Sequence, residues 1–523
     1  MNIDQPPSAT TDRRQFLAAT GAAMLLPPIA HAASGADAKF YALLDTLKET
    51  TPDETVAGAA TARARQVAGL AALRGLDPGL LSFDARLDYD GILEGLGLEA
   101  ILRSRFPFGT VGQTISPHVV SPRVGTYLTV KDGPPEILAR TAANIDGETE
   151  RLNADAAAGI VPPDFILAAT LAKLADTRVT AGPISAALDR QAAALKALRA
   201  QATPEAGVWR LKDGDAYYAL ALKAGTSLSI DPEAAHQAGL DLVAHLSAEA
   251  DAAFRRLGMT DGTVVARFAA LIDRAVGRYD DSDAGRAKAV ADMTATLARA
   301  RAAIAPCFDE IPKSAIAIGL APPGRIGYRV APSYDGSRPG AYYVDLADPV
   351  QGIRYRPAWT LPTVVHHETL PGHLLQLPLQ EKAKPHPLRL RYTPNAFFEG
   401  WGIYAERLAS EIGLLDGDFV QLGVLQSLLV RAARLVVDTG LHHKRWTRAE
   451  AIAKFRAIAL FALNPVDSEV DRIVVEPGAA SGPALGYTTI LNLRGGTALP
   501  RFHTALLKRG PLRLSLLARA VAA

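Results

Sequence analysis

Six segments of this chain carry apolar residues at three- and four-residue spacing, and this pattern constrains the fold more than any other feature. The spacing places the apolar side chains on one face of an α-helix. Asp231 is followed by a proline, a pair that commonly begins a helix because aspartate caps the first turn and proline suits its first position. The sequence therefore predicts a mainly helical protein. The predicted helices span residues 40–47, 137–157, 165–175, 184–198, 232–257 and 287–304.

The composition also favours helix over sheet, because the chain is rich in alanine and leucine and only 6% of its 523 residues are aromatic. A formal net charge of +2 gives no support for a nucleic-acid or acidic-polymer partner. Cys307 is the only cysteine, so neither an intrachain disulfide nor a thiolate metal site can form. Any metal must bind to histidine, aspartate or glutamate.

The first 32 residues have the pattern of an export signal. Two arginines at 13–14 precede a weakly apolar run over 18–29, and residues 30–32 supply a small-x-small cleavage site. A membrane anchor is the competing interpretation, but the apolar run is short and contains two prolines. We therefore expect a twin-arginine signal peptide over 1–32, a mature protein without a membrane anchor, and a periplasmic or secreted location.

A proline- and glycine-rich stretch over residues 322–340 is the best candidate for a boundary. We expect a helical N-terminal region over 33–330 that shapes a cleft, and a C-terminal catalytic region over 331–523. The segment 340–345 is short, aromatic and β-prone. As an exposed strand edge it would pair with an extended peptide through main-chain hydrogen bonds, whereas as a β-turn plug it would only close the core.

The run His366-His367-Glu368-Thr369-Leu370-Pro371-Gly372-His373 carries the residues of a metal site. Together with Glu399, His367 and His373 provide two imidazoles and one carboxylate, a zinc ligand set that leaves the fourth position for water. A spacing of six residues in a regular helix would turn the two rings roughly 120° apart. Pro371 and Gly372 favour a break that re-aims His373 toward His367. The competing interpretation is a buried helix whose histidines are satisfied in the core.

Charged residues around this run have candidate roles. Glu368 is placed as a general base that takes a proton from the water and passes it to the leaving amine. Glu406 shares a helical face with Glu399 and would orient a metal-bound histidine, although a surface ion pair explains it nearly as well. Arg434 and Asp438 are expected to form a helix ion pair rather than a substrate clamp. The donor set favours one Zn²⁺ per chain, and Mn²⁺ or Co²⁺ would also accept it.

Further motifs add a resemblance to a known family. Together with the metal run, they resemble the bacterial family catalogued as a domain of unknown function, DUF885, which is itself similar to the gluzincin zinc peptidases. The resemblance implies a large helical fold that encloses a cleft, with zinc on two histidines and a downstream glutamate. One departure is Leu374, where the family often has another histidine. The motifs span residues 337–343, 397–406, 438–447, 481–487 and 502–512.

Four more residues are candidates for contact with the substrate. The resemblance implies that Tyr487 stabilises the oxyanion, with a buried core tyrosine as the competing interpretation. His442 is a second candidate, or else a cation at a helix C-terminus. Arg338 would hold a substrate carboxylate or position a loop. Tyr342, in the β-prone segment, is a further candidate substrate contact.

Three functions fit these patterns. The first is a periplasmic zinc-dependent metallopeptidase for short peptides, in which Glu368 assists the attack of water. The second keeps the zinc and hydrolyses a non-peptide amide. The third is a secreted binding protein of the same fold without turnover, which the intact Glu368 argues against because a binding protein needs no base beside its metal. A serine hydrolase is disfavoured, because the chain has no Gly-x-Ser-x-Gly elbow.

Overall fold

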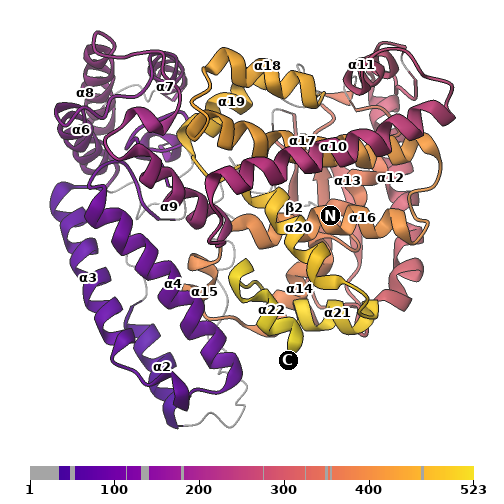
Figure 1. Cartoon of the computed structure of the whole chain (residues 1–523), viewed down its shortest axis with the longest axis horizontal. Coiled ribbons are helices and arrows are strands. Elements are labelled where there is room, and N and C mark those ends of the chain that lie inside the picture. The colour runs from indigo at the N-terminus through magenta and orange to yellow at the C-terminus, as the bar shows by residue number, and fades with distance from the viewer. Residues whose placement is uncertain are drawn as a thin grey trace.

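The chain folds into helices with one small sheet, as a computed structural model shows (Figure 1). The predicted class, mainly α with a short β element, is confirmed. All six segments with helical periodicity lie on helices where the structure describes them. The predicted signal peptide, 1–32, lies outside the described residues. The structure describes residues 35–47, 53–112, 115–130, 140–177, 182–274, 276–323, 325–347, 352–353, 356–460 and 465–523.

The N-terminal helices form two groups at one side of the molecule (Figure 1). They are α2 (Gly35–Thr46), α3 (Val56–Arg74), α4 (Phe83–Arg105), α6 (Thr141–Ala157), α7 (Asp164–Asp176), α8 (Pro183–Leu198) and α9 (Gly214–Thr226), with short 3-10 turns η1 (Pro78–Leu80), η2 (Thr126–Thr129) and η3 (Val208–Arg210). In the first group α3 packs along α4, and the side chains of Thr55 and Ser82 cap their first turns. In the second group α6 packs along α8 around a hydrophobic cluster of its own.

A long apolar helix, α17 (Asp418–His442), packs along α10 (Pro232–Arg256). Among the described helices, α17 alone has the length and apolarity to cross a membrane, yet 72% of its most apolar window is buried inside the protein. Such burial is typical of a core helix. The surrounding elements are α11 (Val264–Asp273), α12 (Asp283–Ile304), η4 (Ala305–Cys307), α18 (Arg448–Ile458) and α19 (Val466–Val475).

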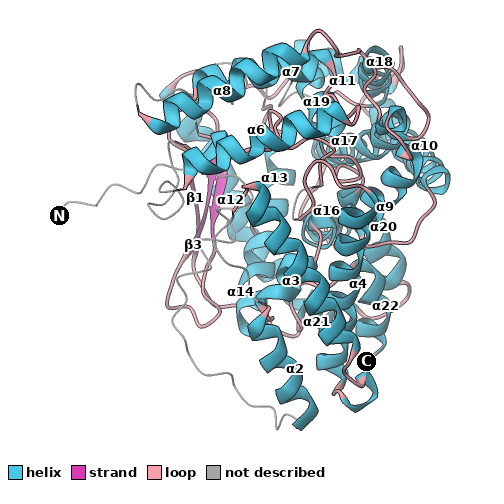
Figure 2. Cartoon of the chain, turned by 90° about the vertical axis from the view of Figure 1, so that its left-hand side faces the viewer, coloured by secondary structure: helices cyan, strands magenta, loops and turns pink. Residues whose placement is uncertain are grey.

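A three-stranded sheet lies beside α12 (Figure 2). Its strands are β1 (Ile316–Leu320), β2 (Tyr328–Val330) and β3 (Gly340–Val344), in the order β1-β3-β2. β3 is parallel to β1 and antiparallel to β2, so the β-prone segment is paired on both sides. The interpretation of this segment as an exposed edge is therefore wrong, and β1 and β2 are the two edge strands of the described sheet. The boundary predicted at residue 330 falls between strands of this one sheet.

Four helices carry the metal motif, the two downstream glutamates and Tyr487: α13 (Leu361–Glu368), α14 (His373–Ala383), α16 (Asn395–Glu411) and α20 (Gly482–Arg494). α16 packs closely along α20, and glycines permit the approach. A Cβ atom at Gly400 would lie 2.6 Å from the carbonyl carbon of Gly486, so a larger residue would force the two helices apart. The remaining helices are α15 (Pro387–Tyr392), α21 (Leu499–Leu507) and α22 (Leu514–Ala522).

Candidate metal centre

The metal motif breaks into two helices at the predicted place. α13 ends at Glu368 and α14 begins at His373, with Pro371 and Gly372 in the turn between them. A Cβ atom at Gly372 would lie 1.9 Å from the carbonyl oxygen of His367, so only glycine fits this turn. The break brings the Nε2 atoms of His367 and His373 within 3.2 Å of each other, which a continuous helix cannot do.

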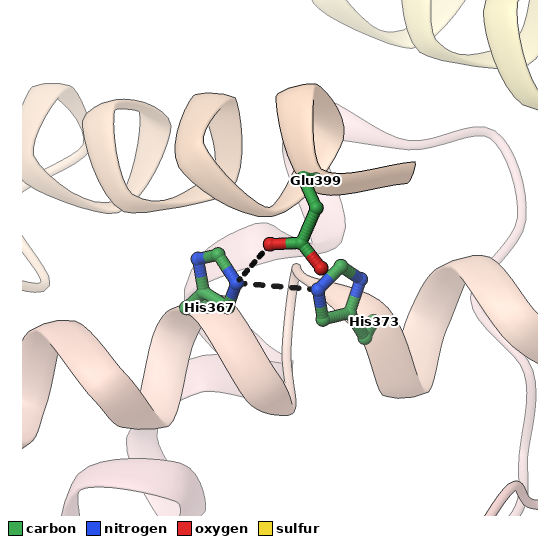
Figure 3. A group of neighbouring side chains, drawn as sticks. All are labelled: His367, His373 and Glu399. Atoms are coloured by element: carbon green, nitrogen blue, oxygen red, sulfur yellow. Dashed lines mark hydrogen bonds and ion pairs between the residues drawn. The ribbon is translucent and has the colours of Figure 1, made fainter. Parts of the chain in front are cut away.

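His367, His373 and Glu399 form one cluster (Figure 3). The two Nε2 atoms of the histidines are 3.2 Å apart, and Glu399 Oε2 lies 3.7 Å from His367 Nε2. Tetrahedral zinc with bonds near 2.0–2.1 Å holds its ligand atoms about 3.3 Å from one another. The donor atoms all lie within 4.8 Å of one another, so the residues present fit one zinc ion with small adjustments.

The other ring nitrogen of each histidine is engaged by a buried partner. His367 Nδ1 lies 2.7 Å from Glu406 Oε1, and the Glu406 side chain is only 1% exposed. His373 Nδ1 lies 3.2 Å from the side-chain oxygen of Gln376, and the His373 ring stacks on Phe398 with centroids 3.9 Å apart. These contacts fix both rings so that each Nε2 faces the cluster. Glu406 is therefore placed to orient His367, as predicted, and is no surface residue.

The local charges suit a site that receives a cation. Burial lowers the pKa of His367, but its hydrogen bonds to Glu399 and Glu406 outweigh burial and raise the pKa to about 9. Burial raises the pKa of Glu399, yet His367 and His373 hold it well below the usual range. Burial drives the pKa of His373 well below its ordinary value. The site thus favours a protonated His367, whose positive charge lies between the Glu399 and Glu406 carboxylates. A metal ion bound there would supply positive charge to the same two carboxylates.

An arginine that the sequence analysis missed completes the cluster. Arg329, on β2, forms an ion pair with Glu368, and its guanidinium lies 5.5 Å from the centre of the Phe398 ring. Burial lowers the pKa of Arg329, while Glu368 and Glu399 raise it and prevail. Arg329 belongs to none of the motifs, and its place depends on the pairing of β2 with β3. It lies in the proline- and glycine-rich stretch over 322–340, whose pattern indicates a boundary and not a site.

A cavity of about 650 Å³ opens beside the cluster. Glu399, Phe398 and Arg329 line it from the metal side. The opposite walls come from α4 and α9 of the N-terminal half and from α19 and the residues before α20. Both parts of the chain therefore shape the space in front of the cluster, and its volume is that of a site for a small ligand.

Comparison with known proteins places the chain in a family. The sequence model of a family described as bacterial protein of unknown function, DUF885, matches residues 28–521. The chain belongs to the DUF885 family. A solved structure described as a putative lipoprotein from Colwellia psychrerythraea is 26% identical, with a TM-score of 0.78 over 94% of this chain and 96% of that one. A second, a putative lipoprotein of unknown function from Shewanella oneidensis, is 17% identical and shares the fold, with a TM-score of 0.68 over 93% and 97%. No curated protein matches the chain.

Two of the residues predicted to contact substrate in this DUF885 member lie on or near the sheet. Tyr342 is buried on β3 opposite Arg329, and burial together with the Glu368 carboxylate raises its pKa. It therefore lies behind the Glu368–Arg329 pair, and it is not among the described residues that line the cavity. Arg338 donates from Nε to the Ala331 carbonyl at 3.0 Å and lies 3.3 Å from a Glu381 oxygen. These contacts position the loop, the alternative role considered for Arg338.

The structure gives one oxyanion candidate a structural role and leaves the other a prediction. Tyr487 is buried in the main hydrophobic core and is not among the described residues that line the cavity. Burial raises its pKa to about 12, and Glu406, the partner of His367, also raises it. His442 Nδ1 accepts from Val208 N at 3.2 Å, and His442 Nε2 lies 3.0 Å from the Ile473 carbonyl oxygen. Both ring nitrogens of His442 are therefore engaged by backbone, and its role is structural.

Proposed function

We propose that this DUF885 protein is a zinc-dependent metallopeptidase that hydrolyses short peptides. The observation that carries the proposal is the convergence of His367, His373 and Glu399 within 4.8 Å at a helix break, with Glu368 adjacent to a ligand. A structural kink alone would not require two buried imidazoles whose Nε2 atoms face each other beside a carboxylate. The position of the cluster at the wall of a cavity supports access for a substrate.

Each residue of the site has a separate role in the proposed reaction. When bound, zinc supplies Lewis acidity and lowers the pKa of water to roughly 7. Glu368 takes the proton of the attacking water and passes it to the leaving amine. Arg329 holds Glu368 in place through their ion pair and offers a cationic donor where negative charge develops on the substrate oxygen, beside the predicted donor Tyr487. Glu406 holds the His367 ring.

The location follows from the leader and the relatives. Both solved relatives are described as putative lipoproteins, a class of exported proteins, which supports export of this chain. We therefore propose twin-arginine export to the periplasm.

The test is metal content and turnover of three variants. Protein purified without chelator or nickel should carry about one zinc per chain by plasma mass spectrometry. Glu368→Gln should keep the zinc and lose roughly a hundredfold or more of kcat on a peptide panel. His373→Ala should lose both. His245→Ala, which removes an exposed histidine far from any metal ligand in sequence, should keep both and is the matched control.

Three results would contradict the proposal. Full zinc occupancy and activity in His373→Ala would show that the ligand set is wrong. A zinc-loaded protein that hydrolyses non-peptide amides but no peptide would identify the alternative amidohydrolase. Absence of zinc, with none taken up on titration, would leave a binding protein of this fold.

A further inference from the structure

The cavity beside the metal centre has many charged residues in its walls, and these charges are paired. Six arginines and four glutamates line the cavity, and each of them has a partner of opposite charge. Arg329 and Arg513 pair with Glu368 and Glu94, which lie outside the wall, and the other four arginines pair with glutamates of the wall itself. A charged side chain of a ligand would have to displace one of these partners and leave a buried charge unpaired. The charged residues therefore give no preference for a charged side chain.

One side of the same cavity is apolar. Six of the residues that line it belong to a second hydrophobic cluster, which contains residues of α4 and α9. We call these six residues the apolar wall: Leu98, Leu102, Val111, Ile115, Ala221 and Ala224. Four of them are only 1–8% exposed, so the cluster holds them in place and their remaining surface faces the cavity. An apolar side chain that covers this surface would leave water without the loss of a hydrogen bond.

The apolar wall lies close to the metal ligands, because α9 ends beside α16, the helix that carries Glu399. A Cβ atom at Gly482 would lie 2.8 Å from the Gly225 carbonyl oxygen and 3.2 Å from Ala396 Cβ. Gly225 directly follows Ala224 of the apolar wall. Ala396 precedes Glu399 by three residues, or about 4.5 Å along the helix axis. One short peptide can therefore reach both the metal cluster and the apolar wall.

Ala224 is the member of the apolar wall whose size can be changed with least disturbance. It lies three residues after Ala221 on α9, so both side chains face the cavity from the same side of the helix. Ala221 is 1% exposed, whereas Ala224 is half-buried. A larger side chain at Ala224 would therefore extend into the cavity and occupy the space that the apolar wall offers to a ligand.

We propose that the apolar wall is a pocket for an apolar side chain of the substrate, so that this site prefers short peptides with a leucine-sized residue. This inference rests on the proposed peptidase function for the identity of the ligand. The cavity volume of about 650 Å³ limits the ligand to a short peptide. The metal cluster would act on the peptide bond, and the apolar wall would select the side chain beside that bond.

The test varies one side chain of trialanine, with the protein in zinc-containing buffer. Leucine, asparagine or glutamate replaces alanine at each of the three positions in turn; asparagine has the same number and branching of heavy atoms as leucine. Binding is measured by calorimetry in the Glu368→Gln background, and KM and kcat are measured in the wild type. At one position, leucine should bind roughly ten- to a hundredfold more tightly than alanine because it adds three carbons. Asparagine and glutamate should bring no such gain.

Two substitutions test whether the apolar wall provides this preference. Ala224→Val and Ala224→Leu add two and three carbons to the wall, so the ratio of leucine to alanine affinities should fall stepwise toward one. The valine variant keeps the test decisive if the leucine variant folds poorly. Ala219→Leu is the matched control, because Ala219 is also half-buried on α9 but does not line the cavity. It should keep the wild-type ratio.

The outcomes separate the pocket from the peptidase. A leucine preference that depends on Ala224, without turnover of any probe, would support the pocket and overturn the peptidase. Turnover with equal affinities for the leucine and asparagine probes would do the reverse, as would a leucine preference that both Ala224 variants retain. A preference for glutamate would show that the site selects a charged side chain and would overturn the apolar pocket. Absence of both binding and turnover would overturn both proposals.

Discussion

Gly402 offers a direct test of the metal geometry, because it lies under the His367 ring. It follows Glu399 by three residues on α16 and faces the same cluster. A Cβ atom at Gly402 would lie 2.7 Å from His367 Cε1 and 2.9 Å from His367 Nε2. Carbon atoms in contact prefer about 3.5–4.0 Å, so Gly402→Ala must displace the ring by roughly 1 Å. Metal sites tolerate changes of only about 0.2 Å in their bond lengths.

The displacement of the ring should weaken zinc binding and have little effect on the stability of the fold. Movement of the ring away from α16 stretches the hydrogen bond between His367 and Glu406 and takes Nε2 away from Glu399, the ligand on the same helix. We expect zinc affinity to fall roughly ten- to a hundredfold, or about 1.4–2.7 kcal/mol. The metal-free protein should unfold at nearly the wild-type temperature, because alanine adds up to about 1 kcal/mol of helix propensity.

The assay is a competition titration with a chromogenic zinc chelator, read beside thermal unfolding of the metal-free proteins. Gly97→Ala is the matched control, since Gly97 is also inside a helix but a Cβ atom there meets nothing within 4 Å. It should leave zinc affinity unchanged and raise stability slightly. A folded Gly402→Ala protein that binds zinc within about threefold of the wild type, a difference near 0.7 kcal/mol, would refute the proposed role of His367.

Two further predictions concern buried carboxylates. Glu406→Gln keeps the shape of the side chain but removes the charge that holds His367. The competition titration should therefore show roughly ten- to a hundredfold weaker zinc binding. Unchanged zinc affinity would show that Glu406 only packs against its neighbours. Burial raises the pKa of Glu148 on α6 to about 7, above its ordinary value of 4.5. The folded state then holds the proton more tightly than the unfolded state, so folding loses stability as pH rises from about 4.5 to 7, by about 3 kcal/mol in all. The unfolding temperature of wild type relative to Glu148→Gln should fall across that range, and a constant difference would contradict the shift.

Local patterns predicted the helices and the break between the two histidines, because both depend on residues near one another in sequence. Helical periodicity depends on side chains within two turns, and it located all six predicted helices. The break between Glu368 and His373 was predictable because Pro371 and Gly372 act on the backbone where they stand. The position of Glu406 was predictable because its spacing from Glu399 puts both side chains on one face of α16. When Glu399 faces the cluster, Glu406 lies on the same side.

Contacts between segments far apart in the sequence determined the features that could not be predicted from local patterns. The order β1-β3-β2 puts Arg329 opposite Tyr342, and no local pattern states which strand becomes the edge. The same limit explains the role of His442, since periodicity predicts its helix but not the neighbours that cover each face of that helix. The backbone groups that engage His442 come from Val208 and Ile473, in η3 and α19, which belong to distant parts of the chain.

The cavity shows why net charge is a weak guide to a ligand. A charge of +2 over 523 residues gave no support for a nucleic-acid or acidic-polymer partner. The fold nevertheless gathers six arginines from β2 and from distant helices and loops around one space beside Glu399. Four glutamates line the same space, and two of the arginines pair with glutamates outside it, Arg329 with Glu368 and Arg513 with Glu94. The relevant quantity for a buried site is therefore the charge of its wall together with that of the residues paired with the wall, and neither can be read from the composition.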